Sequence, residues 1–364
     1  MHRRDLLQAG LALSATACLP RFARADDTFA PTPCPWRRYE VVTRLTLPAG
    51  KSAQAWVPLP SVTEAAWTRP LGNTWATNAT TAEAVRDPAY GVEMLHLTWA
   101  AGETPTAEVT SRFEGRDRAA DLARPGTPSP LSADERRLYT AATDLIPTDG
   151  LVRQTAEKIT TGAATDLAKA RAIYEWVVEN TFRKASVRGC GSGNVAQMLA
   201  LGYLGGKCAD INALFVGLAR SVGLPARDVY GIRVAPSAFG YKSLGANTET
   251  VTKAQHCRAE VYLSDYGWVP VDPADVRKVA LEEPPGNRDI ADPKVRAARG
   301  TLFGAWETNW LAYNMGHDVR LPGSKEAPNA FLMYPEAEVA GWRLDCLDPE
   351  RFAYTITAKQ LSAA

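Results

Sequence analysis

The sequence predicts an α+β fold in which an N-terminal β-sandwich precedes a domain of helices and antiparallel strands. Residues 36–113 alternate between apolar and polar side chains, as half-buried strands do. From Ser132 onward, apolar residues recur at helical spacing instead. The chain has 364 residues, of which 46% are hydrophobic, so it is long enough for two or three domains with apolar cores.

Residues 1–25 predict an export signal. Arg3-Arg4 precedes a short apolar run, and Ala23-Arg24-Ala25 supplies a signal-peptidase site. The paired arginines resemble a twin-arginine signal, so we expect cleavage after Ala25 and a periplasmic or secreted protein. An amphipathic N-terminal helix and a lipid anchor at Cys18 are the alternatives. No later stretch reaches the ~18 apolar residues of a membrane span, so no span is expected.

The chain that follows the signal is nearly neutral. It holds 37 basic and 39 acidic side chains, which argues against a nucleic-acid partner because such partners require a basic surface. It also contains five cysteines. An odd number of cysteines in an exported protein calls for an explanation.

The N-terminal domain is expected over residues 36–115. Strand-like runs at 39–47 and 92–99 are separated by turn residues such as Pro48-Ala49-Gly50, a pattern that favours a small β-sandwich. Residues 116–131 are charged and then rich in proline and glycine, which is typical of a linker.

A second domain is expected over residues 132–305. Ser132 lies three residues before Glu135, the arrangement of a capping box at a helix N-terminus. Further helices are expected at 151–161 and 166–180, because their apolar residues fall on one face. Residues 306–364 mix aromatic, polar and proline residues, and we expect an extension that packs on this domain.

The most informative segment runs from Gly205 to Pro225. Its apolar residues predict a helix that begins near Cys208, behind two glycines. A cysteine at a helix N-terminus is favoured as a thiolate by the helix dipole, and Lys207 adds positive charge while Asp210 opposes it. Unpaired backbone N–H groups there can also bind an oxyanion. We therefore interpret Cys208 as a nucleophile, since a structural cysteine would lie further along the apolar face.

A thiolate nucleophile needs a general base, and three histidines follow the signal. His96 lies in the expected sandwich, and His317 is a rival base or a substrate contact. His256 begins an alternating strand that puts it on the same face as Arg258 and Glu260. We therefore favour His256 as the base.

A hairpin brings a carboxylate within reach of His256. Residues 264–267 form a turn signal, and 268–273 is the returning strand. If Leu263 pairs with Gly267, Asp272 lies diagonal to His256 on the same face, ~7–8 Å away. A slip of one residue would put the two on opposite faces, so this register is a testable requirement.

Three motifs in this order resemble the transglutaminase-like core of bacterial proteins. They are Gly206-Lys207-Cys208 with its helix ending in Gly223-Leu224-Pro225-Ala226-Arg227 and the following Val229-Tyr230-Gly231, then Gln255-His256, then Trp268-Val269-Pro270-Val271-Asp272-Pro273. The resemblance covers about residues 165–280 and implies a papain-related core, with the cysteine helix packed on an antiparallel sheet. It implies that Cys208 is the nucleophile, His256 the base and Asp272 the orienting acid. It also implies an N-terminal β-domain, which accompanies such cores in many bacterial members.

The chain departs from the family pattern at one position. Many relatives carry an aromatic residue two positions after the histidine, where this chain has Arg258. The departure leaves the shape or charge of the substrate pocket open. Gln197 and Tyr203 precede the cysteine and are candidates for a second oxyanion donor, but neither spacing is decisive and we favour a helix-packing role for each.

Two other chemistries are weighed against the cysteine enzyme. The glycine-rich loop at 188–193 lacks the Gly-Lys-Ser/Thr of a phosphate cradle and is interpreted as a flexible loop beside the cleft. Cys190, Cys208, His256 and Cys257 supply zinc-ligand atoms, but no C-x-x-C or H-E-x-x-H motif is present. Adjacent strand residues also point to opposite faces. We therefore expect neither a metal nor a cofactor.

The sequence thus predicts an exported cysteine enzyme that forms an acyl-thioester with the carbonyl of a peptide or protein amide. A peptidase or amidase is favoured, because water is ubiquitous and transamidation requires a site for an amine. A protein-glutamine transamidase and a non-catalytic binding module are the alternatives, and the oligomeric state is open. With Cys208 kept free, the other four cysteines allow two disulfides in three pairings, or none; they are Cys34, Cys190, Cys257 and Cys346.

Overall fold

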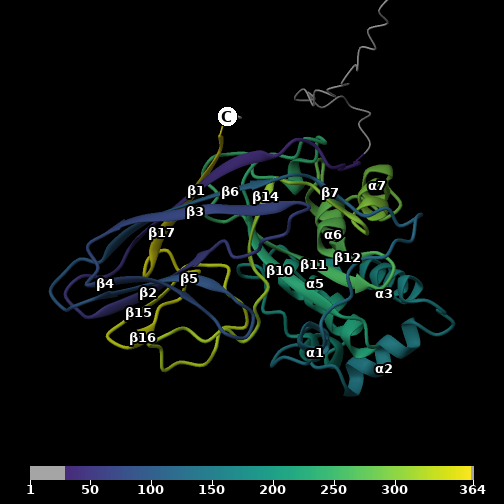
Figure 1. The fold of residues 1–364 in the computed structure, drawn as a ribbon, viewed down its shortest axis with the longest axis horizontal. Coiled ribbons are helices and arrows are strands. Elements are labelled where there is room, and N and C mark those ends of the chain that lie inside the picture. Colours follow the sequence, from purple (N-terminus) through teal and green to yellow (C-terminus); the bar gives the residue numbers. More distant parts are fainter. Residues whose placement is uncertain (1–28, 362–364) are drawn as a thin grey trace, which may run out of the picture.

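The N-terminal residues fold as two sheets that share an apolar core, as the alternation predicts. The computed structural model describes residues 29–361, with these two sheets on one side and the helices on the other (Figure 1). The first sheet has the order β17-β1-β6-β3 and the second β16-β15-β2-β5-β4. Leu45 and Val109 of the first sheet pack with Val57 and Leu97 of the second. The strand bounds are β1 Arg37–Thr46, β2 Ala53–Leu59, β3 Thr68–Thr77, β4 Thr81–Arg86, β5 Glu93–Trp99, β6 Thr106–Gly115, β15 Glu336–Val339, β16 Trp342–Arg343 and β17 Ala353–Leu361.

The C-terminal residues complete these sheets. β17 pairs antiparallel with β1, from Leu361 opposite Arg38 to Ala353 opposite Thr46. β15 pairs with β2 in the second sheet. Residues 306–364 therefore do more than the packing role that the sequence suggested, because they cover edges of β1 and β2 that would otherwise be open. The domain boundaries drawn from the sequence stay predictions.

The second half of the molecule is built on a four-stranded antiparallel sheet of order β12-β11-β10-β14. Its strands are β10 Ala226–Arg233, β11 Gln255–Leu263, β12 Gly267–Val271 and β14 Trp310–Asn314. Helix α5 (Cys208–Ser221) packs on β10 and β11, and every one of its residues is buried. This is the cysteine helix on an antiparallel sheet that the sequence predicted.

The other helices surround α5. α2 (Gly150–Ile159), α3 (Asp166–Asn180) and α6 (Pro273–Glu282) each contact it. The capping box of α1 (Ala133–Thr140) is confirmed: the Glu135 N–H donates to Ser132 Oγ at 3.2 Å, and the Ser132 N–H donates to Glu135 Oε2 at 2.9 Å. The remaining elements are short, namely β7 Arg118–Ala119, β8 Phe182–Arg183, α4 Val195–Ala200, β9 Gly205–Gly206, the 3-10 helix Lys242–Leu244, α7 Pro293–Thr301 and β13 Ala305–Trp306.

The segment 116–131, predicted as a linker, contacts the core sheet along its course. β7 pairs with β13, and the Arg118 guanidinium contacts both the Glu260 carboxylate and the Trp268 carbonyl. Tyr262 donates a hydrogen bond to the Ser129 carbonyl at 2.8 Å. These bonds fix the chain where it passes between the two halves.

Within residues 29–361, no helix combines the length and the apolarity needed to cross a membrane. The predicted signal at 1–25 lies outside the described residues.

Candidate active site

Cys208 is the first residue of α5 and is only 4% exposed. Lys207 precedes it as the N-cap in extended conformation, so the helix begins where the glycine pair β9 ends. The Ala209 N–H is bonded to the Cys190 carbonyl at 2.9 Å. Among the described residues no acceptor takes the Cys208 N–H, which therefore stays free at the positive end of the helix dipole.

Asp210 ties the loop at 188–193 to the start of α5. Its carboxylate accepts hydrogen bonds from the backbone N–H groups of Ser192, Gly193 and Lys207 at 2.9, 3.0 and 2.9 Å. A Cβ on Gly191, whose φ is +93°, would lie 1.8 Å from Asp210 Oδ2. Glycine is therefore required there, because this loop closes directly over the carboxylate. Cys190 in the same loop comes to lie beside Cys208.

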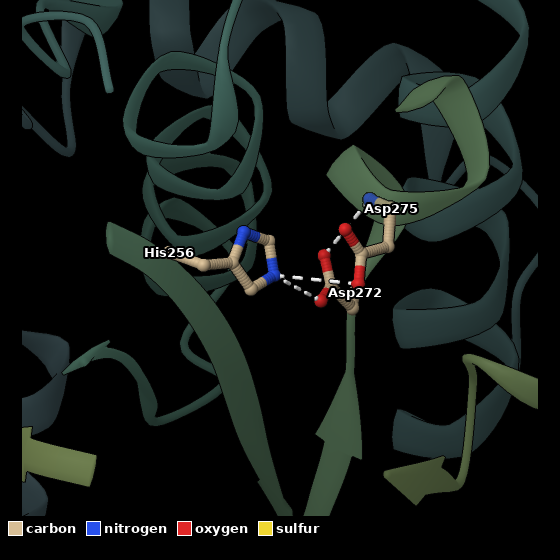
Figure 2. A group of neighbouring side chains, drawn as sticks. All are labelled: His256, Asp272 and Asp275. Carbon is tan, nitrogen blue, oxygen red and sulfur yellow. Dashed lines mark hydrogen bonds and ion pairs between the residues drawn. The ribbon is translucent and has the colours of Figure 1, made fainter. Parts of the chain in front are cut away.

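The predicted hairpin register is confirmed. β11 and β12 pair from Leu263 opposite Gly267 to Ala259 opposite Val271. Asp272 is the next residue, and its Oδ2 lies 2.7 Å from His256 Nε2 (Figure 2). Asp272 also caps α6, since its Oδ1 accepts the Asp275 N–H at 3.0 Å. One carboxylate thus orients the imidazole and starts a helix, which holds it rigidly.

Asp275 is a second carboxylate beside His256 that the sequence analysis missed. Its Oδ2 lies 3.4 Å from His256 Nε2 (Figure 2). Its other oxygen accepts a hydrogen bond from the Arg233 guanidinium. Burial and Arg233 lower the pKa of His256, but the two carboxylates outweigh them and raise it above its ordinary value. The sequence does contain a signal for this position, because Asp272-Pro273 is typical of a helix start with proline in the first turn. Asp275 is then the third residue of that helix and lies next to Asp272, the N-cap.

Arg258 lies behind Asp272 and does not line the substrate cavity. Its Nε is 3.7 Å from Asp272 Oδ2, its Nη1 donates to the Glu307 carbonyl at 3.0 Å, and its guanidinium lies 4.7 Å from the Trp310 ring centroid. Burial lowers the pKa of Arg258 to about 10, so the group stays charged at neutral pH. Arg258, the residue that departs from the family pattern, therefore contacts Asp272 and does not shape the cavity.

The surroundings of Cys208 favour the ionised form of its thiol. Hydrogen bonds from the Cys190 and Cys257 thiols hold the pKa of Cys208 well below its usual value. Burial opposes this effect, and His256 adds to it through a hydrogen bond and its charge. Because Nε2 of His256 faces the carboxylates, its Nδ1 is the nitrogen left for Cys208. The pKa values of Cys190 and Cys257 are raised, so both remain protonated donors.

The cysteines within the described residues are all free thiols, so the structure has the alternative without disulfides; they are Cys34, Cys190, Cys208, Cys257 and Cys346. Cys190 and Cys257 are buried beside Cys208, and the Cys190 thiol also contacts the Gln255 carbonyl at 3.3 Å.

Cys208 and His256 open onto one cavity of about 460 Å³. Gln255 also lines it, and its buried Nε2 has no hydrogen-bond partner among the described residues. Gln197 and Tyr203, the sequence candidates for an oxyanion donor, line a different cavity that touches neither catalytic candidate. The sequence analysis missed Gln255, because its position before His256 gives no hint of a free amide.

His317 is buried away from this cavity. Its Nδ1 lies 3.4 Å from the Tyr230 hydroxyl, and its Nε2 lies 3.5 Å from Asp228 Oδ2. Burial and Arg220 lower the pKa of His317 well below its ordinary value. It is therefore not placed to act as the rival base.

His256, Asp272 and Asp275 are also close enough together to resemble a metal-ligand set. Their oxygens are already engaged, however. The Asp275 N–H and the Asn212 amide at 3.3 Å bind Asp272 Oδ1, and Arg233 binds Asp275. A hydrogen-bonded network accounts for the cluster without a cation.

Comparison with known proteins agrees with this geometry. Residues 153–273, which include Cys208, His256 and Asp272, match the family model described as the transglutaminase-like superfamily. A protein of Haemophilus influenzae, described as uncharacterized, is 37% identical over 335 residues, which are 87% of this chain and 89% of that protein.

A solved structure shares the fold. The crystal structure of a candidate cysteine protease from Cytophaga hutchinsonii superimposes with a TM-score of 0.51 at 14% identity, covering 90% of this chain and 99% of that one. The chain belongs to the transglutaminase-like superfamily.

Proposed function

We propose that this protein is a cysteine peptidase or amidase in which Cys208 is the nucleophile, His256 the general base and Asp272 the acid that orients it. The observation that carries the proposal is the buried 2.7 Å contact between His256 Nε2 and Asp272 Oδ2, beside a cysteine that opens onto the same cavity as the histidine. A low thiol pKa at that position supplies the attacking sulfur at neutral pH.

The three side chains act in turn in the proposed reaction. The Cys208 thiolate attacks the amide carbonyl, and the carbonyl oxygen becomes an oxyanion that the free Cys208 N–H can bind. The His256 imidazolium then gives its proton to the leaving amine, which departs and leaves an acyl-thioester on the sulfur. Water attacks the thioester while His256 takes its proton, and the acid is released. Asp272 keeps the ring orientation and stabilises the imidazolium throughout.

The nucleophile assignment is tested by alkylation near pH 6. Wild-type protein and the His256→Ala variant are treated with iodoacetamide, and the labelled cysteines are identified by mass spectrometry. We expect rapid labelling confined to Cys208 in the wild type and slow labelling in the variant. The other buried cysteines serve as internal controls in the same digest.

The matched control is His317→Ala, which removes a buried histidine that does not line the cavity. Its Cys208 labelling should equal that of the wild type. Equal, slow labelling of Cys208 in all three proteins would contradict the assignment. A peptide library with and without an added amine then separates hydrolysis from transamidation, because a hydrolase gives mainly free acids when the amine is present, whereas a transamidase gives mainly peptide–amine adducts.

We propose further that the protein acts in the periplasm, and the predicted twin-arginine signal supports this. Replacing Arg3 and Arg4 by lysine should leave the protein in the cytoplasmic fraction of fractionated cells. Unchanged export of the variant would contradict the signal assignment.

A further inference from the structure

The cavity that holds Cys208 is lined by cations. Six basic side chains line it, and no described aspartate or glutamate does. The six are Arg183, Arg188, Lys207, Arg233, Lys253 and Lys278. The chain as a whole has nearly equal numbers of acidic and basic residues, so this cavity is locally enriched in basic side chains.

Three carboxylates outside the lining compensate part of this charge. Asp275 binds Arg233, and Asp345 binds Arg188 at 2.8 Å. Glu282 is shared, because it contacts the Arg183 guanidinium and lies 3.9 Å from Lys278 Nζ. Six cations thus face three carboxylates, and the cavity keeps an excess of positive charge.

Two of the cations lack any carboxylate partner. Within the described part of the chain, neither the Lys207 ammonium nor the Lys253 ammonium has a carboxylate oxygen within 4.0 Å of its Nζ, although the Lys207 backbone N–H binds Asp210. Lys207 is the residue before Cys208, and Lys253 lies three residues before His256. Both therefore line the cavity and are close in sequence to the two reacting side chains.

Lys278 is partly buried among these cations. Burial, and then the charge of Arg233, lowers the pKa of Lys278 to about 8. Arg183 acts in the same direction. Mutual repulsion of this kind is relieved when an anion enters, so the site is built to gain from negative charge on a ligand.

We infer that the acyl donor is an acidic peptide, one that carries a free carboxylate at or next to the residue whose carbonyl Cys208 attacks. The inference rests on the proposed function and names its substrate class. Successive residues of an extended peptide are ~3.3–3.6 Å apart, so a carboxylate one residue from the reacting carbonyl lies within reach of a lysine adjacent to the cysteine. The cavity volume of about 460 Å³ accommodates a short segment.

The first test compares iodoacetate with iodoacetamide. The two reagents alkylate a thiolate by the same displacement of iodide and differ in charge. Rates at Cys208, each divided by the rate with glutathione, give a charge-preference ratio. We expect this ratio to favour iodoacetate, to fall with added salt, and to fall about threefold in each of Lys207→Gln and Lys253→Gln and roughly tenfold in the double variant.

Any change in the thiolate content of Cys208 in these variants alters both alkylation rates equally and therefore cancels in the ratio. Lys184→Gln is the matched control, since Lys184 is an exposed neighbour that does not line the cavity. Thermal melting checks that all variants fold. A charge-preference ratio that responds neither to salt nor to the two lysine substitutions would overturn the inference.

The second test measures binding and does not depend on any reaction of Cys208. Calorimetric titration of the Cys208→Ser variant uses an acetylated, amidated hexapeptide of alternating alanine and glutamate, and its glutamine counterpart. We expect the glutamate peptide to bind at least tenfold more tightly. Equal affinities would overturn the inference. Binding of the acidic peptide together with an unreactive Cys208 would refute the proposed function and leave the charge preference standing.

Discussion

Replacing Asp272 by asparagine should abolish the reactive ion pair while preserving the fold. The substitution keeps an oxygen that can accept the Asp275 N–H and cap α6, as Oδ1 does now at 3.0 Å. The other position of the amide becomes an NH₂ group facing His256 Nε2, where a carboxylate oxygen now lies at 2.7 Å. A neutral ring that accepts from this NH₂ must carry its proton on Nδ1, the nitrogen left for Cys208, and it can no longer take the thiol proton.

The size of the effect follows from the geometry. Carboxylate and imidazolium charge centres about 4 Å apart interact by about 4 kcal/mol at an effective dielectric constant of 20. Since 1.36 kcal/mol corresponds to one pKa unit, the pKa of His256 should fall by about three units. The ion pair of the wild type exists between the lowered pKa of Cys208 and the raised pKa of His256. In the variant the pKa of His256 is lower, so the pH range in which the ion pair exists shrinks at its upper limit.

The assay is the rate of Cys208 alkylation by iodoacetamide between pH 4 and pH 9. We expect the wild type to react well at pH 6 and the Asp272→Asn variant to react about a hundredfold more slowly there, with its reactivity appearing only at higher pH. Asp228→Asn is the control, because Asp228 is also fully buried but faces His317. An Asp272→Asn protein that folds normally and keeps the wild-type pH profile would refute the reasoning.

Three further outcomes are expected. Gln255→Leu should slow p-nitrophenyl acetate hydrolysis about a hundredfold if its free amide binds the oxyanion, while iodoacetamide alkylation, which forms no oxyanion, stays unchanged; equal rates of hydrolysis would exclude that role. Burial raises the pKa of Asp228 to about 7, so its stabilising effect is present below the unfolded pKa near 4 and is lost as pH rises to 7. Asp228→Asn should therefore gain about 3 kcal/mol in unfolding free energy relative to the wild type between pH 5 and pH 7, as measured by urea denaturation, and a constant difference would contradict this. A chain that begins after Ala25 should titrate five thiols in denaturant without reductant, whereas one thiol would indicate two disulfides.

The parts of the site that the sequence predicted are those set by local rules. Helical periodicity and the glycine pair predicted where α5 begins, and α5 indeed starts at Cys208. A strand period of two and a short turn fix the hairpin register, so the approach of Asp272 to His256 followed from counting residues. Both arguments need only neighbours within about twenty residues in the chain.

The parts that the sequence analysis missed depend on contacts between distant segments. Alternation shows that residues near 353–361 can form a strand, but it does not show that their partner is β1, more than 300 residues earlier. Arg258 left the shape or charge of the pocket open, because it stands where many relatives carry an aromatic residue, on the same strand face as His256. The tryptophans of a later segment fold over that face and bury it behind Asp272.

Residues near the C-terminus also line the cavity that holds Cys208. Besides the six basic side chains, residues that follow β14 in the chain line the cavity. They are Tyr334, Cys346, Leu347, Pro349, Phe352 and Tyr354. These residues lie outside the range 153–273 that matches the family model. The chemistry of the site is therefore encoded within the family core, whereas the shape of the cavity depends on how the C-terminal strands join β1 and β2. Relatives that keep the motifs of the family core but differ in these strands are expected to differ in substrate.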